Sequence, residues 1–225
     1  MNKHKAFTLS EVLITIAIVG VIAAITLPVL INKYREMVIV NRLRDCYAVF
    51  SQAYLMAIND NGDITNWDIG NIATLDGSKK LYNYFKPYLK NVKECNDRKG
   101  GCFATSYKAL FSEFPYIYQP NLASYYTGGM LANGISFTFW SGGNTNHYGA
   151  IKVDINGIKG PNRAGVDYFS FFIGKDRISP EYVTATNGYG EFCKYNNSSR
   201  YNGAMCTGWV INNGNLDYLR RDVTK

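Results

Sequence analysis

A long apolar segment lies next to the N-terminus of the 225-residue chain. A short, polar and positive stretch, residues 1–6, precedes it, and residues 12–27 contain no charged side chain. About 20 apolar residues in a helix, each rising about 1.5 Å, cross the hydrocarbon core of a bilayer. We therefore expect residues 7–31 to form a membrane-spanning helix. Lys3 and Lys5 in front of it favour a cytoplasmic N-terminus.

The rest of the composition argues against catalysis. Only two histidines occur, His4 and His147. This scarcity disfavours a metal site with several histidine ligands and restricts any histidine-based catalytic triad to one candidate base. The sequence contains neither a G-x-S-x-G nucleophile elbow nor a phosphate-binding glycine loop. With 47% apolar and 18% charged residues the chain has the composition of a folded protein. We predict no catalytic residues and no enzyme activity.

Two simple explanations account for only part of the apolar segment. A secretory signal has an apolar run of about 7–15 residues followed by small residues at the cleavage site, whereas this run is longer and no such site follows Pro28. A plain membrane anchor explains the length but not Glu11, a carboxylate at the edge of the run. A charge at mid-helix depth costs about 2.5–3.5 kcal/mol on insertion scales, so Glu11 indicates either a partner or snorkelling to the headgroup layer.

The residues around Glu11 resemble a known processing signal. Residues 5–28 read KAFTLSEVLITIAIVGVIAAITLP, which is similar to the class III prepilin signal of type IV pilins and type II secretion pseudopilins. The resemblance implies that a prepilin peptidase cuts between Ala6 and Phe7 and that the new amino group of Phe7 is methylated. Family members more often carry glycine before the cut, so Ala6 is a tolerated departure that can slow processing. The resemblance covers roughly the first 30 residues.

The resemblance also assigns a role to Glu11, which becomes the fifth residue of the mature chain. In the apolar core of a filament its carboxylate pairs with the Phe7 ammonium of a neighbouring subunit. In a medium of low dielectric constant this pair is strong and an unpaired charge is heavily penalised, so Glu11 sets the stagger between subunits. Gly20 and Pro28 lie at positions where helices of the family are loosened, and a bend is expected there.

The implied function is that of a structural subunit in a type IV pilus-like or type II secretion pseudopilus filament. The precursor would be a single-pass protein of the bacterial inner membrane, with its head on the periplasmic side. The implied partners are membrane lipid, the prepilin peptidase and methyltransferase, the inner-membrane assembly platform and homologous pilin subunits. The alternative is a membrane-anchored periplasmic or surface binding domain that never polymerises.

The helical pattern continues beyond the membrane segment. Residues 32–59 carry apolar side chains at i, i+3 and i+4 spacing, which is typical of one buried helix face. These positions are Ile39, Leu43, Cys46, Phe50, Ala53 and Ala57. A soluble surface helix shows the same periodicity, but continuity with residues 7–31 favours one long helix that ends in the turn-rich stretch near residues 59–62.

Residues 60–225 are expected to form the head. Residues 60–80 read as a loop with a short helix, and residues 81–89 as a second short helix. Strand patterns follow at residues 135–140, 150–155, 167–173 and 206–211, the first two as a hairpin. An antiparallel sheet of about four strands packed on a long N-terminal helix is an α+β fold, and the pilin family has the same architecture.

Four of the five cysteines lie in the head. Because the resemblance places the head in an oxidising compartment, we expect disulfides. The local pairs Cys95–Cys102 and Cys193–Cys206 are preferred, and crossed pairings remain open because connectivity cannot be read from sequence. Zinc is the rival, although its ligands are usually two to four residues apart, unlike these cysteines. Cys46, on the apolar helix face, is expected to be a buried free thiol.

One turn-rich segment of the head offers oxygen ligands. Asp154, Asn156 and Asp167, together with loop carbonyls, are of the kind that Ca²⁺ prefers, and some major pseudopilins carry calcium near the C-terminal sheet. The spacing is not that of an EF-hand. The alternative is a β-turn in which the Asp154 and Asn156 side chains form hydrogen bonds with the local backbone. Apart from calcium, we expect no cofactor.

A basic and aromatic stretch raises a third possibility, a DNA-binding minor pilin. An ordinary solvated face explains the same residues, so we do not expect nucleic acid as a partner. The basic residues are Lys79, Lys80, Lys86, Lys90, Lys93, Arg98 and Lys99, interleaved with Tyr82, Tyr84, Phe85 and Tyr88.

Overall fold

The computed structural model describes residues 8–90, 92–95, 101–120, 124–142, 147–180 and 191–223. The chain divides into two compact units, Met1–Val38 and Ile39–Lys225. The helix α1 (Leu9–Asn61) contributes residues to both units. It continues through Gly20 and Pro28, so the predicted long helix is present, while a bend at these two residues stays a prediction.

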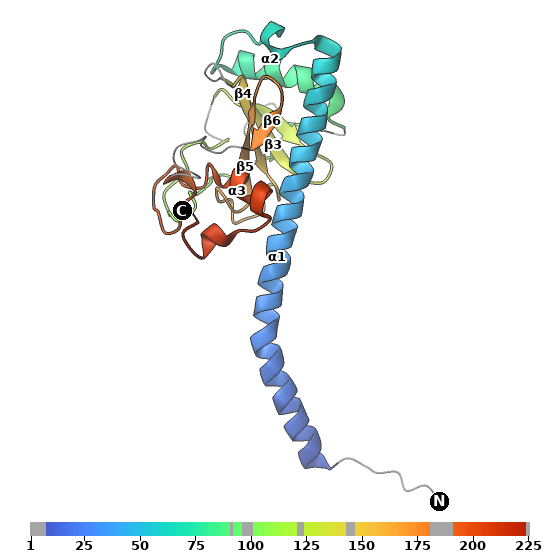
Figure 1. The fold of residues 1–225 in the computed structure, drawn as a ribbon, viewed down its shortest axis with the longest axis vertical. Helices are drawn as coiled ribbons and strands as arrows, with labels where there is room; N and C mark the ends of the chain where they lie inside the picture. The colour runs from blue at the N-terminus through green and yellow to red at the C-terminus, as the bar shows by residue number, and fades with distance from the viewer. Residues whose placement is uncertain are drawn as a thin grey trace, which may run out of the picture. The chain divides into compact units, whose positions relative to one another are not determined.

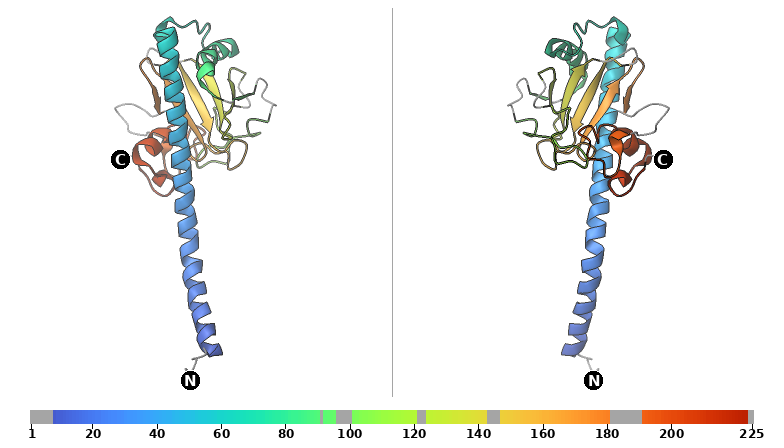
Figure 2. Two further views of the ribbon diagram at one scale, coloured as in Figure 1. Left: turned by 90° about the vertical axis from the view of Figure 1, so that its right-hand side faces the viewer. Right: turned by 90° about the vertical axis from the view of Figure 1, so that its left-hand side faces the viewer.

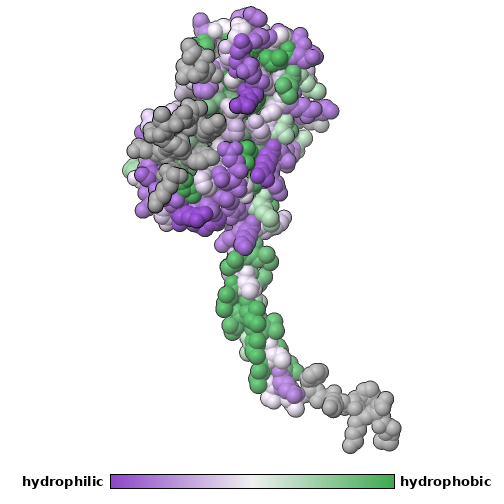
Figure 3. All heavy atoms as spheres, in the orientation of Figure 1, coloured by the Kyte–Doolittle hydropathy of each residue, from purple (hydrophilic) through white to green (hydrophobic). Residues whose placement is uncertain are grey.

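The first unit consists of the N-terminal part of α1. Its residues from Leu9 to Val38 are exposed with few exceptions, and most of them are apolar. Figure 3 shows this part of the helix as an almost continuous hydrophobic surface. An exposed apolar surface of this extent is unstable in water, so it requires a lipid or protein environment.

The second unit begins with the remainder of α1, which buries one face in the core of the head. The expected positions are confirmed, with Ile39 only partly buried. Tyr54 adds to this face: its ring stacks on Phe85 with centroids 5.8 Å apart, and its hydroxyl bonds the Gly174 carbonyl at 2.8 Å. Figure 1 shows this cyan part of α1 beside the sheet. The buried residues of α1 are Val40, Leu43, Cys46, Phe50, Ala53, Tyr54 and Ala57.

Short helices follow α1. The 3-10 helix η1 (Ile64–Asn66) precedes α2 (Leu75–Phe85), which Thr74 caps by accepting the Gly77 N–H at 3.1 Å. The helix predicted over residues 81–89 therefore begins six residues earlier. It gives way to the 3-10 helix η2 (Lys86–Tyr88) because Pro87 cannot continue the α-helical hydrogen bonds.

In the described part of the head, the sheet has six antiparallel strands in the order in which they occur in the chain, rather than about four. The three longest strands lie where the sequence pattern predicts them. The short strands β1, β2 and β6 carry no alternating pattern long enough to recognise. The strands are β1 (Lys93–Glu94), β2 (Thr127–Met130), β3 (Ser136–Ser141), β4 (Gly149–Asp154), β5 (Tyr168–Ile173) and β6 (Ile178–Pro180).

Alternation along the strands gives the sheet two buried faces. On β5, Phe169 and Phe171 join the main core, where Phe171 stacks on Tyr47 of α1 with centroids 5.7 Å apart. Tyr168 lies in a second, smaller cluster with Tyr107 and other residues of the irregular segments. Both views in Figure 2 show α1 beside the sheet within this unit. The head is thus a sheet between α1 and a cover of loops.

The strand predicted at residues 206–211 is wrong, because this segment forms α3 (Cys206–Asn213). Its apolar residues at alternate positions also satisfy helical spacing, since Cys206 and Val210 are four residues apart and both fully buried. Gly214 ends the helix in the left-handed region, with φ of +67°, and its N–H bonds the Val210 carbonyl. A glycine after asparagine is as typical of a helix C-terminus as of a hairpin turn.

Candidate functional site

The N-terminus of α1 is fixed by a reciprocal pair of hydrogen bonds between Thr8 and Glu11. The Glu11 carboxylate accepts the Thr8 N–H at 2.8 Å and the Thr8 hydroxyl at 2.9 Å. The Thr8 hydroxyl oxygen in turn accepts the Glu11 N–H at 3.3 Å. This is a capping box, in which the threonine before the helix and the glutamate three residues later satisfy each other's free backbone donors. The pattern T-x-x-E is visible in the sequence, so Thr8 could have been recognised there.

The capping box directs the Glu11 carboxylate toward the end of the helix at which a cleaved chain would begin. Ala6 and Phe7, the predicted cleavage and methylation residues, lie outside the described residues, so both modifications stay predictions. A carboxylate near a helix N-terminus is also favoured by the partial positive charge of the helix dipole. Glu11 is therefore held at the N-terminal end of α1.

Among the described residues, α1 is the one helix long and apolar enough to cross a membrane. Two of its polar side chains are compatible with an apolar environment because they bond within the helix. The Thr15 hydroxyl donates to the Val12 carbonyl and the Thr26 hydroxyl to the Ile22 carbonyl, each at 2.9 Å. Neither hydroxyl enters lipid or a helix bundle without a hydrogen-bond partner.

The cysteines of the head form the two preferred local disulfides. Cys95 pairs with Cys102 and Cys193 pairs with Cys206, which leaves none of the four for zinc. Cys46 is a buried free thiol, as expected. Burial raises the pKa of the Cys46 thiol to about 12, so it is unreactive near neutral pH.

The structure brings the three predicted calcium ligands together at the turn between β4 and β5. The Asp167 carboxylate accepts the backbone N–H groups of Asn162 at 2.7 Å and Arg163 at 2.6 Å, and the Asn156 side-chain amide at 3.2 Å. Asp154 accepts the Asn156 backbone N–H at 3.2 Å, as the β-turn interpretation predicts. Donors from the protein itself thus reach both Asp167 oxygens and one Asp154 oxygen. Calcium binding at this turn stays a prediction.

Tyr107 is the partner of Asp154 that sequence reasoning missed. Its hydroxyl donates to the second Asp154 oxygen at 2.7 Å, and both residues are fully buried. Because 47 residues separate the two in sequence, no local pattern could have linked them. The contact attaches the loop that covers the outer face of the sheet to β4.

Burial governs the protonation of this pair of carboxyl groups. Burial raises the pKa of Asp154 to about 8; the Tyr107 hydrogen bond opposes this rise and the nearby Asp167 charge adds to it. Burial also raises the pKa of Asp167, although the hydrogen bonds from the N–H groups of Arg163 and Asn162 act in the opposite direction and lower it. Two amide oxygens at the same turn, Asn156 Oδ1 and Asn162 Oδ1, are buried with no donor among the described residues.

The remaining candidates have structural explanations. Lys80 forms an ion pair with Asp68 at 3.0 Å, and Tyr82 and Phe85 are buried, so these aromatic rings are not free to stack on bases. Arg98 and Lys99 lie outside the described residues. His147 stacks on Phe172 with ring centroids 4.3 Å apart. No group of three or more histidine, cysteine or acidic side chains suited to a metal occurs among the described residues.

Comparison with known proteins agrees with the N-terminal geometry. The prokaryotic N-terminal methylation motif matches residues 1–27. Together with the long apolar helix and the antiparallel head, this motif supports a class III prepilin signal like that of the type IV pilin and pseudopilin family.

The chain belongs to a family of unknown function, DUF6613, which matches residues 29–174 and so spans the end of the membrane segment and most of the head. No curated protein and no solved structure matches the chain.

Proposed function

We propose that this protein is a structural subunit of a type IV pilus-like or pseudopilus filament and assembles through the N-terminal part of α1. The single observation that carries the proposal is the exposed apolar surface of this helix with one carboxylate, Glu11, held at its start. A prepilin peptidase cuts before Phe7, and the head lies on the periplasmic side of the inner membrane. The two disulfides of the head support an oxidising location.

In the assembled state the Glu11 carboxylate of one subunit neutralises the Phe7 ammonium of its neighbour. The Thr8 bonds do not exhaust the carboxylate, because its two oxygens have about four acceptor sites and both Thr8 bonds end on Glu11 Oε2. The capping box therefore orients the carboxylate without preventing an ion pair between subunits.

Two substitutions separate the charge of Glu11 from its role in the helix cap. Glu11→Gln keeps a side chain that can complete a capping box but removes the charge, whereas Glu11→Asp keeps the charge on a shorter side chain. We expect Glu11→Gln and Glu11→Ala to remain in the membrane and to be absent from sheared filaments, with Glu11→Asp retaining partial incorporation. Membrane and filament fractions are compared by immunoblotting. Normal incorporation of Glu11→Gln would contradict the charge-pairing role.

The alternative function, a membrane-anchored binding domain that does not polymerise, shares the anchor and the oxidised head. It differs in its genetic context, because a polymerising subunit requires a prepilin peptidase, an assembly ATPase and a polytopic platform protein. The alternative function also predicts that the protein is absent from every sheared filament fraction.

A further inference from the structure

The unit of residues 39–225 begins close in sequence to the apolar segment that crosses the membrane. Seven residues, 32–38, separate Ile31, the last residue of the predicted span, from Ile39, the first residue of the unit. All of them belong to α1, and eight steps of about 1.5 Å along a helix amount to about 12 Å. This short tether keeps the end of the head that carries Ile39 near the bilayer surface.

The turn that follows β4 lies at this tethered end of the head. The Arg42 guanidinium donates to the Ile155 carbonyl at 3.1 Å, which fixes the residues after β4 beside the first turns of α1 in this unit. At the other end of β4, Gly149 lies against Leu81 of α2. Figure 1 shows α2 beside the last turns of α1. The strand β4 therefore runs toward the tethered end and delivers the turn there.

The turn presents an apolar side chain next to a cation. Ile158 is 54% exposed, and the adjacent Lys159 is exposed as well. The Asn156 side-chain amide fixes the turn by donating to the Gly160 carbonyl at 3.1 Å and to the Asp167 carboxylate at 3.2 Å. An exposed apolar side chain beside a lysine suits a membrane interface, where the apolar group enters the acyl boundary and the amine stays among the headgroups. Because the turn is already ordered, little entropy is lost when it docks.

The C-terminal segment brings further cations to the same end. Gly214 lies against Arg44 of α1, and the Tyr218 hydroxyl donates to the Gly165 carbonyl at 2.6 Å. Residues 39–45, 155–160 and 214–222 thus meet there, with five cations against three acids and a net positive charge. The cations are Arg42, Arg44, Lys159, Arg220 and Arg221, and the acids are Asp45, Asp217 and Asp222.

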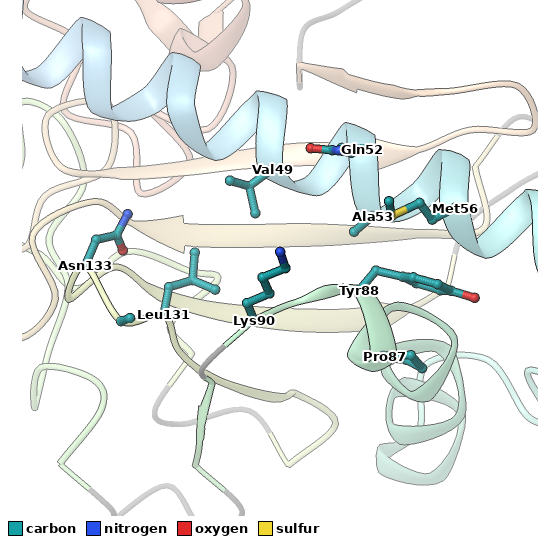
Figure 4. Close-up of a pocket in the computed structure, with 10 residues that line it drawn as sticks. Val49, Gln52, Ala53, Met56, Pro87, Tyr88, Lys90, Leu131 and Asn133 are labelled. Atoms are coloured by element: carbon teal, nitrogen blue, oxygen red, sulfur yellow. The ribbon is translucent and has the colours of Figure 1, made fainter.

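Other exposed apolar side chains of the head lie away from the tethered end. A groove of about 540 Å³ beside α1 exposes Met56 on its wall, at 44% (Figure 4). Met56 lies fourteen residues beyond Arg42 on α1, which is about 21 Å along a helix. Ile72, at 60% exposure, precedes α2. Of these three apolar side chains, Ile158 is the one that combines the tethered end with a neighbouring cation.

We propose that the turn of residues 155–160 docks on the anionic lipid headgroups of the membrane that holds α1. Ile158 enters the boundary between headgroups and acyl chains, while Lys159 and Arg42 lie among the lipid phosphates. The continuity of the turn with a membrane-spanning helix and its positive charge both favour this occupant. The contact goes beyond the filament function, because it belongs to the subunit while it is still in the bilayer and requires only the membrane anchor.

Fluorescence quenching by lipid tests the contact with the full chain in nanodiscs. The variant Ile158→Cys is labelled with an environment-sensitive fluorophore; Cys46 is buried and the other cysteines are in disulfides, so one site reacts. Nanodiscs of phosphatidylcholine alone are compared with nanodiscs that also contain phosphatidylglycerol, each with a nitroxide lipid as quencher. A chelator prevents calcium from bridging the turn to the lipid. We expect strong quenching in the anionic nanodiscs and weak quenching in the neutral ones, with the control variant Met56→Cys unquenched in both.

Charge reversal at the turn separates specific docking from a general effect of net charge. Adding Lys159→Glu to the labelled variant is expected to lower the ratio of docked to undocked heads roughly tenfold, because two units of charge change beside an anionic surface. The matched control Lys79→Glu makes the same change at an exposed position on α2 and should leave the quenching unchanged. Equal quenching in neutral and anionic nanodiscs, equal quenching at Met56, or equal effects of the two charge reversals would each overturn the contact.

The docking contact and the filament function fail in different ways. Filaments that contain the chain, together with an unquenched label at residue 158 in nanodiscs, overturn the lipid contact and leave the filament function standing. A quenched label in a chain that never occurs in sheared filaments supports the lipid contact and contradicts the filament function.

Discussion

Glu11 combines two roles that are usually assigned to different residues. Its carboxylate completes the capping box with Thr8 and is also the acidic group at the N-terminal end of a long apolar surface. The sequence is sufficient to predict the second role, because a carboxylate at the edge of an apolar run has few explanations. The first role depends on where the helix begins, and this boundary is the least certain feature of a sequence pattern.

Thr8→Val tests the capping box. The substitution removes the hydroxyl that accepts the Glu11 N–H and is expected to destabilise the first helical turn by about 1 kcal/mol. Amide exchange of residues 9–12 should become roughly fivefold faster in detergent micelles, with residues 40–57 unchanged as an internal control. Unchanged exchange at residues 9–12 would show that the cap is not formed in solution.

Asp154 makes the stability of the head depend on pH. Its pKa is raised from the ordinary value of 3.8 to about 8 in the folded chain, so the folded state holds a proton that the unfolded state has released. The contribution of Asp154 to stability is therefore complete below about pH 4 and is lost as pH rises through about 8.

In a buffer with chelator, the melting temperature of the full chain in detergent should fall between pH 6 and pH 9, and Asp154→Asn should weaken this dependence. Tyr107→Phe, which removes a donor to the carboxylate, should lower stability by about 1–3 kcal/mol, most strongly at high pH. A melting temperature that rises from pH 6 to pH 9 would contradict this account. Repeating the series with Ca²⁺ tests the calcium prediction, since binding to the folded state raises the melting temperature.

At the scale of elements, α1 and the central strands are predictable and α3 is not. Leu43, Phe50 and Ala57 repeat at a spacing that only a helix places on one face, over many turns. The segment that forms α3 is short, and the spacing of Cys206, Gly208 and Val210 fits a strand as well as a helix. Its disulfide and its burial against β5, where Thr207 accepts the Ser170 N–H at 3.0 Å, decide between the two.

The strand β2, which lies between β1 and β3, shows why the short strands of the sheet could not be predicted. Its residues Thr127–Met130 include two glycines, which are depleted in strands. At Gly128 a Cβ atom would lie 1.9 Å from the Phe137 carbonyl oxygen, so the close approach of β3 requires glycine. The sequence shows the glycine, but the constraint comes from a strand that follows later in the chain.

The disulfide between Cys193 and Cys206 is expected to be the main covalent support of α3. The Cys193→Ala/Cys206→Ala variant should lose about 3 kcal/mol of stability, as expected for a loop of about 15 residues. Thermal unfolding of the variant and of the Cys95→Ala/Cys102→Ala variant measures the effect, and the shorter Cys95–Cys102 loop should contribute less. A larger loss from the Cys95–Cys102 pair would contradict the loop-entropy explanation.

At the scale of the whole molecule, the apolar residues divide between two environments. Those of the first unit are exposed along α1, whereas those of the head form a core around the sheet. The overall fraction of apolar residues hides this division, and only their position in the sequence reveals it. The Tyr107–Asp154 hydrogen bond joins residues 47 apart in sequence, so it was not predictable before the structure.

The central claim is that the chain is processed as a prepilin and assembled through its N-terminal helix. The most direct measurement is mass spectrometry of the N-terminal peptide of the protein recovered from sheared filaments. The account predicts a mature chain that lacks residues 1–6 and begins with N-methylated Phe7. A chain that begins at Met1, or one that is cut after residue 31 and released without its apolar helix, would contradict it.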